Sequence, residues 1–79
     1  MFGEEHPFIA TALNNLAGLY QNKGEYEKAE SLYNRALEII RNSLGEEHPN
    51  VAITLNNLAG LYVSVGRFEE ALLFFIIIL

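Results

Sequence analysis

The sequence predicts an all-α protein made of two stacked helix-turn-helix units, with four helices in all. Three observations predict this class. The segment LNNLAGLY occurs at Leu13–Tyr20 and again at Leu55–Tyr62, a shift of 42 positions. The segment GEEHP recurs at the same shift, at Gly3–Pro7 and Gly45–Pro49. Within each unit, apolar residues recur every three or four positions, as on one face of a helix. A repeat of this kind indicates units that bury their apolar faces against each other.

The first helix is expected to begin at His6-Pro7, because proline is tolerated in the first helical turn. Glu4 and Glu5 come just before it, where the helix dipole favours negative charge. A glycine turn within Asn22–Tyr26 (NKGEY) is expected to end the helix. Its buried stripe is predicted to be Ile9, Leu13, Leu16, Ala17 and Tyr20.

The second helix is expected to run from about Glu25 to Ser43. Its polar residues recur on one face, which we expect to be solvated. The predicted buried stripe is Tyr26, Ala29, Leu32, Tyr33, Ala36, Leu37 and Ile40, and the polar face is Glu27, Lys28, Glu30, Ser31, Asn34, Arg35, Glu38 and Arg41.

The third helix repeats the signals of the first. It is expected to begin at His48-Pro49, after Glu46 and Glu47, and to end at the glycine turn within Ser64–Phe68 (SVGRF). The two GluGluHis triplets are interpreted as turns and helix caps, because they lack the spacing of a helical metal-binding motif. Together these signals divide one domain, 1–79, into repeat one (3–44) and repeat two (45–79), the latter truncated in its second helix.

The fourth helix departs from the pattern of the second. An inward stripe of Phe68, Ala71, Leu72, Phe75 and Leu79 is expected. Across the 42-residue shift, Glu30, Ser31, Asn34 and Arg35 are replaced by Leu72, Leu73, Ile76 and Ile77. A helix that is apolar on all sides must be buried. We therefore expect self-association, most simply as a homodimer that could exchange helices, through Leu72, Leu73, Phe74, Ile76, Ile77 and Leu79.

The apolar end of the chain has two alternative origins. The chain could be a truncated reading frame, or a fragment of a longer array. Membrane attachment is disfavoured, because the apolar run 71–79 is too short to span a bilayer and has few basic neighbours.

The composition excludes several classes of function. The chain has 79 residues and a formal net charge of −5, so nothing attracts nucleic acid or anionic lipid. It has no cysteine, which excludes disulfides and thiol catalysis. No signal peptide is visible, so a cytoplasmic location is the default. No catalytic, cofactor-binding or metal-binding motif is present, and we expect no enzymatic activity.

The residues shared by the two units resemble the tetratricopeptide repeat. The pattern appears at Leu13, Leu16, Ala17, Tyr20, Gly24, Tyr26, Ala29, Tyr33 and Ala36, and again at Leu55, Leu58, Ala59, Tyr62, Gly66, Phe68, Ala71 and Phe75. The period is 42 residues rather than the usual 34, and the closing proline after Leu37 is missing. The longer period and the HisPro start are similar to the kinesin light chain subclass.

The resemblance implies an α-solenoid segment that binds protein or peptide segments and needs no cofactor. The first helix of each unit would line a concave groove for an extended peptide. An asparagine amide both donates and accepts, so it can hold a peptide backbone, and glycine leaves room for that backbone. The expected groove residues are Asn14, Asn15, Gly18, Gln21, Asn22, Asn56, Asn57, Gly60 and Ser64, with Thr11, Ile53 and Val63 beside them. The alternative is a structural, self-assembling or truncated fragment with no ligand of its own.

Overall fold

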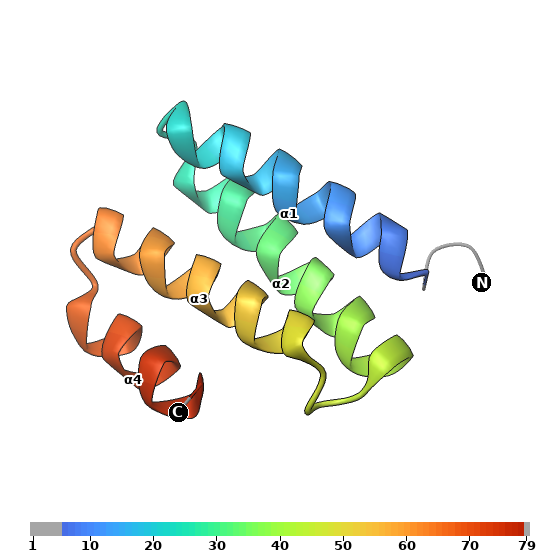
Figure 1. The fold of residues 1–79 in the computed structure, drawn as a ribbon. Helices are drawn as coiled ribbons and strands as arrows, with labels where there is room; N and C mark the ends of the chain where they lie inside the picture. Colours follow the sequence, from blue (N-terminus) through green and yellow to red (C-terminus); the bar gives the residue numbers. More distant parts are fainter. Residues whose placement is uncertain (1–5, 79) are drawn as a thin grey trace.

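The computed structural model describes residues 6–78, in which four helices lie side by side in chain order (Figure 1). Their bounds are Pro7–Asn22 (α1), Tyr26–Leu44 (α2), Pro49–Ser64 (α3) and Phe68–Ile78 (α4). The molecule measures 36 × 29 × 14 Å, so it is a slab in which α2 and α3 lie between α1 and α4. The prediction of an all-α fold with two helix-turn-helix units is confirmed.

The two repeats begin their first helices in the same way. The Nδ1 atom of His6 accepts a hydrogen bond from the backbone N–H of Phe8 at 3.1 Å. His48 accepts one from the N–H of Asn50 at 3.0 Å. The proline after each histidine occupies the first turn, where its missing N–H costs no hydrogen bond. Both histidines therefore serve as N-caps, as expected.

The glycine turns close α1 and α3 with the same hydrogen bonds. After α1, the N–H of Gly24 donates to the carbonyl of Gln21 at 3.0 Å, and that of Glu25 donates to Tyr20 at 2.9 Å. This is the Schellman arrangement, in which the glycine takes a left-handed conformation. Gly24 has φ = +84°, and Gly66 after α3 has φ = +82°.

The bounds of α2 agree with the predicted range to within one residue at each end. Its C-terminal turn is tied to the following loop, because Arg41 pairs with Glu46 at 3.0 Å. Arg41 is thus half-buried and paired rather than simply solvated. The glutamates expected before α1 lie outside the described residues.

Small side chains allow the helices to approach closely. Alanines at the helix contacts are fully buried, and Thr54 is a buried polar residue among them. The larger members of the core come from α2 and α3. The core consists of Ala10, Ala17, Ala29, Tyr33, Ala36, Leu37, Ile39, Ile40, Val51, Leu55, Leu58, Ala59, Leu61, Tyr62 and Ala71.

The predicted stripes of α1 and α2 need three corrections. Leu16 and Tyr26 are both more than one-third exposed. Ile39, which was not in the predicted stripe, is buried.

The predicted inward stripe of α4 is confirmed at Ala71 and wrong at its other described members. Ala71 is buried, and Phe74 and Ile78 pack against the core, whereas Phe68, Leu72 and Phe75 are exposed. Since nearly every residue of this helix is apolar, its sequence does not say which side faces inward. The contact with α3 decides it, because the ring of Phe74 lies 5.2 Å from that of Tyr62. Leu79 lies outside the described residues.

Within residues 6–78, no helix has the length and apolarity needed to cross a membrane.

Candidate functional site

A polar hollow lies between α1 and α3, where the peptide groove was expected. Its volume is ≈ 230 Å³. Ile40 of α2 contributes to its lining, and the other lining residues come from the two first helices of the repeats. They are Thr11, Asn14, Asn15, Asn50, Ile53 and Asn57.

Asn14 links the two repeats. Its Nδ2 donates to the hydroxyl of Thr54 at 3.1 Å. Its Oδ1 is buried and has no hydrogen-bond partner within residues 6–78. An unpartnered buried acceptor costs free energy. Because the atom is buried, an incoming N–H group reaches it only if neighbouring side chains move.

Gln21 is already committed to neighbours at the far end of the groove. Its Oε1 accepts from the hydroxyl of Tyr33 at 3.0 Å, and its Nε2 donates to Ser64 at 3.4 Å. Ser64 in turn donates to the carbonyl of Gly60 at 3.1 Å. Burial raises the pKa of Tyr33, which keeps its hydroxyl protonated as a donor. The predicted groove residues Gln21 and Ser64 therefore join α1 to α3.

The remaining asparagines separate into different surroundings. Asn15 is exposed and Asn57 half-buried, and both line the α1–α3 hollow. Asn22 is exposed at the end of α1. Asn56 lines a different hollow of ≈ 420 Å³ on the other side of α3, with Ala52, Ile53, Phe75 and Ile78. The structure thus brings Asn14, Asn15 and Asn57 together and leaves Asn56 with α4.

Gly18 and Gly60 are not required by helix packing. A Cβ atom added at Gly18 would lie 3.8 Å from the hydroxyl of Tyr33, an ordinary contact. One added at Gly60 would meet nothing within 4 Å. Glycine in mid-helix is destabilising relative to alanine. Neither glycine lines the α1–α3 hollow, so a role for them in a groove stays a prediction.

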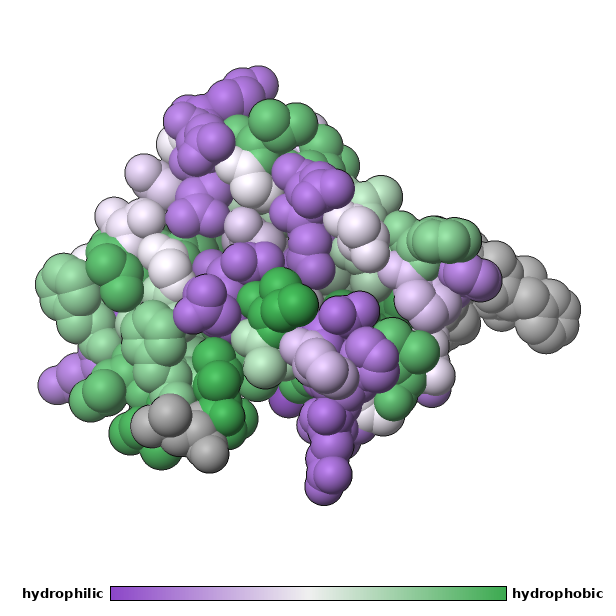
Figure 2. Space-filling model, in the orientation of Figure 1, coloured by the Kyte–Doolittle hydropathy of each residue, from purple (hydrophilic) through white to green (hydrophobic). Residues whose placement is uncertain are grey.

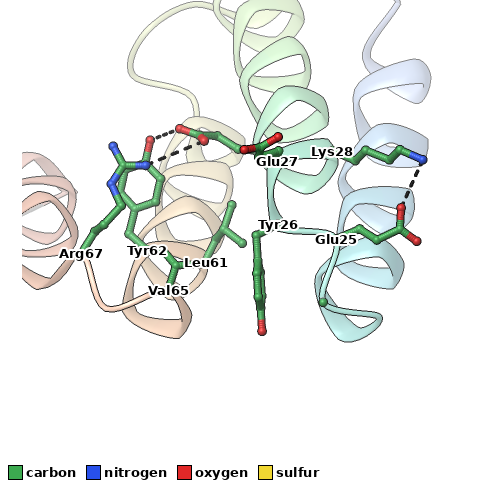
Figure 3. Close-up of a pocket in the computed structure, with 10 residues that line it drawn as sticks. Glu25, Tyr26, Glu27, Lys28, Leu61, Tyr62, Val65 and Arg67 are labelled. Atoms are coloured by element: carbon green, nitrogen blue, oxygen red, sulfur yellow. Dashed lines mark hydrogen bonds and ion pairs between the residues drawn. The ribbon is translucent and has the colours of Figure 1, made fainter.

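A second hollow, which the sequence did not indicate, lies where the start of α2 meets the end of α3 (Figure 3). Its volume is ≈ 580 Å³. Tyr26 and Lys28 line it from α2, and Leu61, Val65 and Arg67 from α3 and the turn after it. In Figure 3, Tyr26 stands between the two helices.

One edge of this hollow carries a polar cluster of Glu30, Tyr62 and Arg67. The hydroxyl of Tyr62 donates to the carboxylate of Glu30. The guanidinium of Arg67 lies 4.4 Å from the centre of the Tyr62 ring and 3.9 Å from Glu30. Burial, followed by the hydrogen bond to Glu30, raises the pKa of Tyr62 to about 12. The phenol therefore stays protonated, and the cluster holds α2, α3 and the following turn together.

The sequence prediction placed Glu30 on a solvated face. That interpretation was wrong, because Glu30 is half-buried and bonded to the next repeat. The periodicity of one helix cannot reveal a partner 32 positions away. The only available signal was Tyr62 itself, since a buried tyrosine hydroxyl usually finds an acceptor.

The exposed face of α4 is apolar. Leu72, Leu73, Ile76 and Ile77 are 58 %, 60 %, 55 % and 63 % exposed. Figure 2 shows hydrophobic side chains gathered over α4 at the lower left of the molecule. Phe74, which was predicted to take part in self-association, instead packs against Tyr62 in the core.

A family model described as "Tetratricopeptide repeat" matches residues 8–75. The chain belongs to the tetratricopeptide repeat family. Domains of this family are generally protein–protein interaction modules and are typically non-catalytic. A comparison with curated proteins found none that matches the chain. The two helical hairpins described above are its two tetratricopeptide repeats.

Proposed function

We propose that this tetratricopeptide repeat chain is a non-catalytic binding module that holds an extended peptide in the hollow between α1 and α3. The observation that carries the proposal is the hollow itself, which is lined by Asn14 of α1 and by the two further asparagines named next. Asn15 and Asn57 line the same hollow. Their amides offer donors and acceptors to both sides of a peptide backbone.

The residues that line the hollow also indicate which kind of peptide it can hold. The named groove positions carry no Lys or Arg, so a ligand held by its terminal carboxylate is disfavoured. Ile53 and Ile40 are the apolar residues of the lining. The ligand is thus a main-chain segment with a small apolar side chain, bound mainly through its backbone amides.

A random peptide library selected on the wild-type chain supplies the probe. Replacing Asn15 and Asn57 together by Ala is expected to weaken the selected peptide by about tenfold, the equivalent of one or two hydrogen bonds. Asn34→Ala is the matched control, because Asn34 is exposed on α2 away from the hollow. Isothermal titration calorimetry gives the affinities. Equal peptide affinities for the double variant and wild type would contradict peptide binding in the α1–α3 hollow.

We further propose that the chain self-associates through the exposed face of α4. Burying a large apolar side chain is worth roughly 1.5–3 kcal/mol. Solvent-exposed residues of this size usually stand singly on a protein surface. On α4 they are contiguous, as Leu72, Leu73, Ile76 and Ile77.

Light scattering at micromolar concentration tests this second part. Wild type is expected to exceed the mass of one chain, 8.9 kDa. A polar variant with Leu72→Lys, Leu73→Glu, Ile76→Lys and Ile77→Glu is expected to be monomeric and still helical. A monomeric wild type, or an unchanged mass in the variant, would count against self-association through α4.

Two finer assignments belong to the same proposal. The 42-residue period and the HisPro helix starts favour the kinesin light chain-like subclass. A cytoplasmic location is compatible with a chain that has no cysteine and so needs no oxidising compartment.

A further inference from the structure

The two copies of LNNLAGLY lie in different surroundings. In α3, Leu58 and Leu61 are 0 % and 1 % exposed. Their counterparts in α1, Leu16 and Leu19, are 41 % and 62 % exposed. The difference arises because α3 packs between α2 and α4, whereas the described residues include no helix on the side of α1 that faces away from α2 and α3. One face of α1 therefore presents residues that α3 buries.

The helix that covers this face of α3 is α2. Tyr26 and Glu30 of α2 line one hollow together with Leu61 of α3. The hydroxyl of Tyr62 donates to Glu30 across the same contact. The α2–α3 contact thus shows how a second helix of one repeat receives the first helix of the next.

The corresponding face of α4 has no such helix on it within residues 6–78. At the shift of 42, Phe68 stands for Tyr26 and Leu72 for Glu30. Both are more than half exposed. By contrast, Leu73, Ile76 and Ile77 correspond to Ser31, Asn34 and Arg35, which are exposed on α2 even though α3 is in place.

We propose that α1 of a second copy of this chain docks on α4, in the way that α3 docks on α2 within one chain. The inference rests on the self-association proposed above and names its second surface. Leu16 and Leu19 of one copy meet Phe68 and Leu72 of the other. The contact joins two different surfaces and is therefore heterologous. Every pair of chains still has one free α1 surface and one free α4 surface.

The polar links of the internal contact are absent from this joint. Leu72 replaces the Glu30 acceptor, and Ala12 replaces the Thr54 hydroxyl that receives Asn14. Val63 occupies the position that corresponds to Gln21, so the hydrogen bond that Gln21 donates to Ser64 has no counterpart. The joint between copies is consequently apolar, which matches the apolar character of α4.

Two blocked variants test the pairing of surfaces. The head-blocked chain carries Leu16→Gln and Leu19→Lys, and the tail-blocked chain carries Phe68→Lys and Leu72→Lys. Each alone is expected to be monomeric in sedimentation experiments, with association weakened at least about tenfold. An equimolar mixture is expected to form a heterodimer, because each chain keeps the surface that the other has lost.

The outcomes separate this inference from the proposed self-association. A head-blocked chain that still dimerises would mean that α4 pairs with α4, which overturns the inference and leaves self-association intact. A mixture that stays monomeric also overturns it. A wild-type monomer would defeat both. Ser31→Lys with Arg35→Glu, on the exposed face of α2, is the matched control and should leave the association unchanged.

Disulfide trapping provides a readout that does not depend on weakening the joint. The chain has no cysteine, so introduced thiols are the only ones. Leu19→Cys and Leu72→Cys correspond to Leu61 and Glu30, which line the same hollow. On mild oxidation, a mixture of the two single-cysteine chains should give mainly the mixed dimer. Predominant Leu72→Cys homodimer would contradict the head-to-tail joint.

Discussion

At the residue level, Tyr62 is where the two repeats are joined most specifically. Its hydroxyl donates to Glu30 on α2, and its ring lies under the guanidinium of Arg67. Arg67 is itself paired with Glu70 through an Nη2–Oε2 distance of 2.7 Å. Since every charged member of this cluster has a partner, the cluster stabilises the inter-repeat contact despite its partial burial.

Tyr62→Phe is expected to destabilise the chain by about 1–2 kcal/mol, because Glu30 loses a hydrogen bond at a partly buried position. Urea unfolding followed by circular dichroism measures the change. Tyr26→Phe serves as the control, since Tyr26 is more than one-third exposed, and it should have little effect. Equal effects of the two substitutions would argue against a role for the Glu30 bond.

The same tyrosine gives the stability a pH dependence. The pKa of Tyr62 is raised to about 12, whereas a tyrosine in an unfolded chain titrates near 10. Between these values the unfolded chain has lost a proton that the folded chain keeps. The contribution of Tyr62 to the free energy of unfolding is therefore fully present below about pH 10. It falls as the pH rises towards 12, by on the order of 2 kcal/mol. Urea midpoints across this range should fall less steeply in Tyr62→Phe, and parallel curves would contradict the assignment.

At the element level, helix bounds could be predicted from the sequence because local residues set them. HisPro starts each first helix, and Gly24 and Gly66 end those helices with left-handed turns. The inward face of α4 could not be predicted, because its residues are apolar on every side. The hollow at the start of α2 was also missed, since it forms only where α2 meets α3.

The mid-helix glycines permit a prediction about α3. Gly60→Ala is expected to stabilise the chain by about 0.5–1 kcal/mol, because alanine loses less conformational entropy on folding and its Cβ meets open space. Thermal unfolding measures this. Gly66→Ala is the contrasting variant and should destabilise, since φ = +82° strains any residue with a Cβ. If Gly60→Ala also weakens the selected peptide, the glycine leaves room for the ligand.

At the level of the whole molecule, a head-to-tail joint predicts open-ended growth. Each added copy leaves one α1 surface and one α4 surface free, so the weight-average mass should rise continuously with concentration. Sedimentation over a wide concentration range measures it, with the head-blocked chain as the monomeric reference. A plateau at twice 8.9 kDa would indicate a closed two-fold dimer instead.

The identical octapeptide in α1 and α3 has a consequence for folding. Both helices pack against α2, with the same eight side chains available to each. The side chains of this segment alone therefore cannot decide which helix takes which place beside α2. The tight turn after α1 and the longer connection before α3 make that choice, so the covalent order of the chain carries information that its residues leave undetermined.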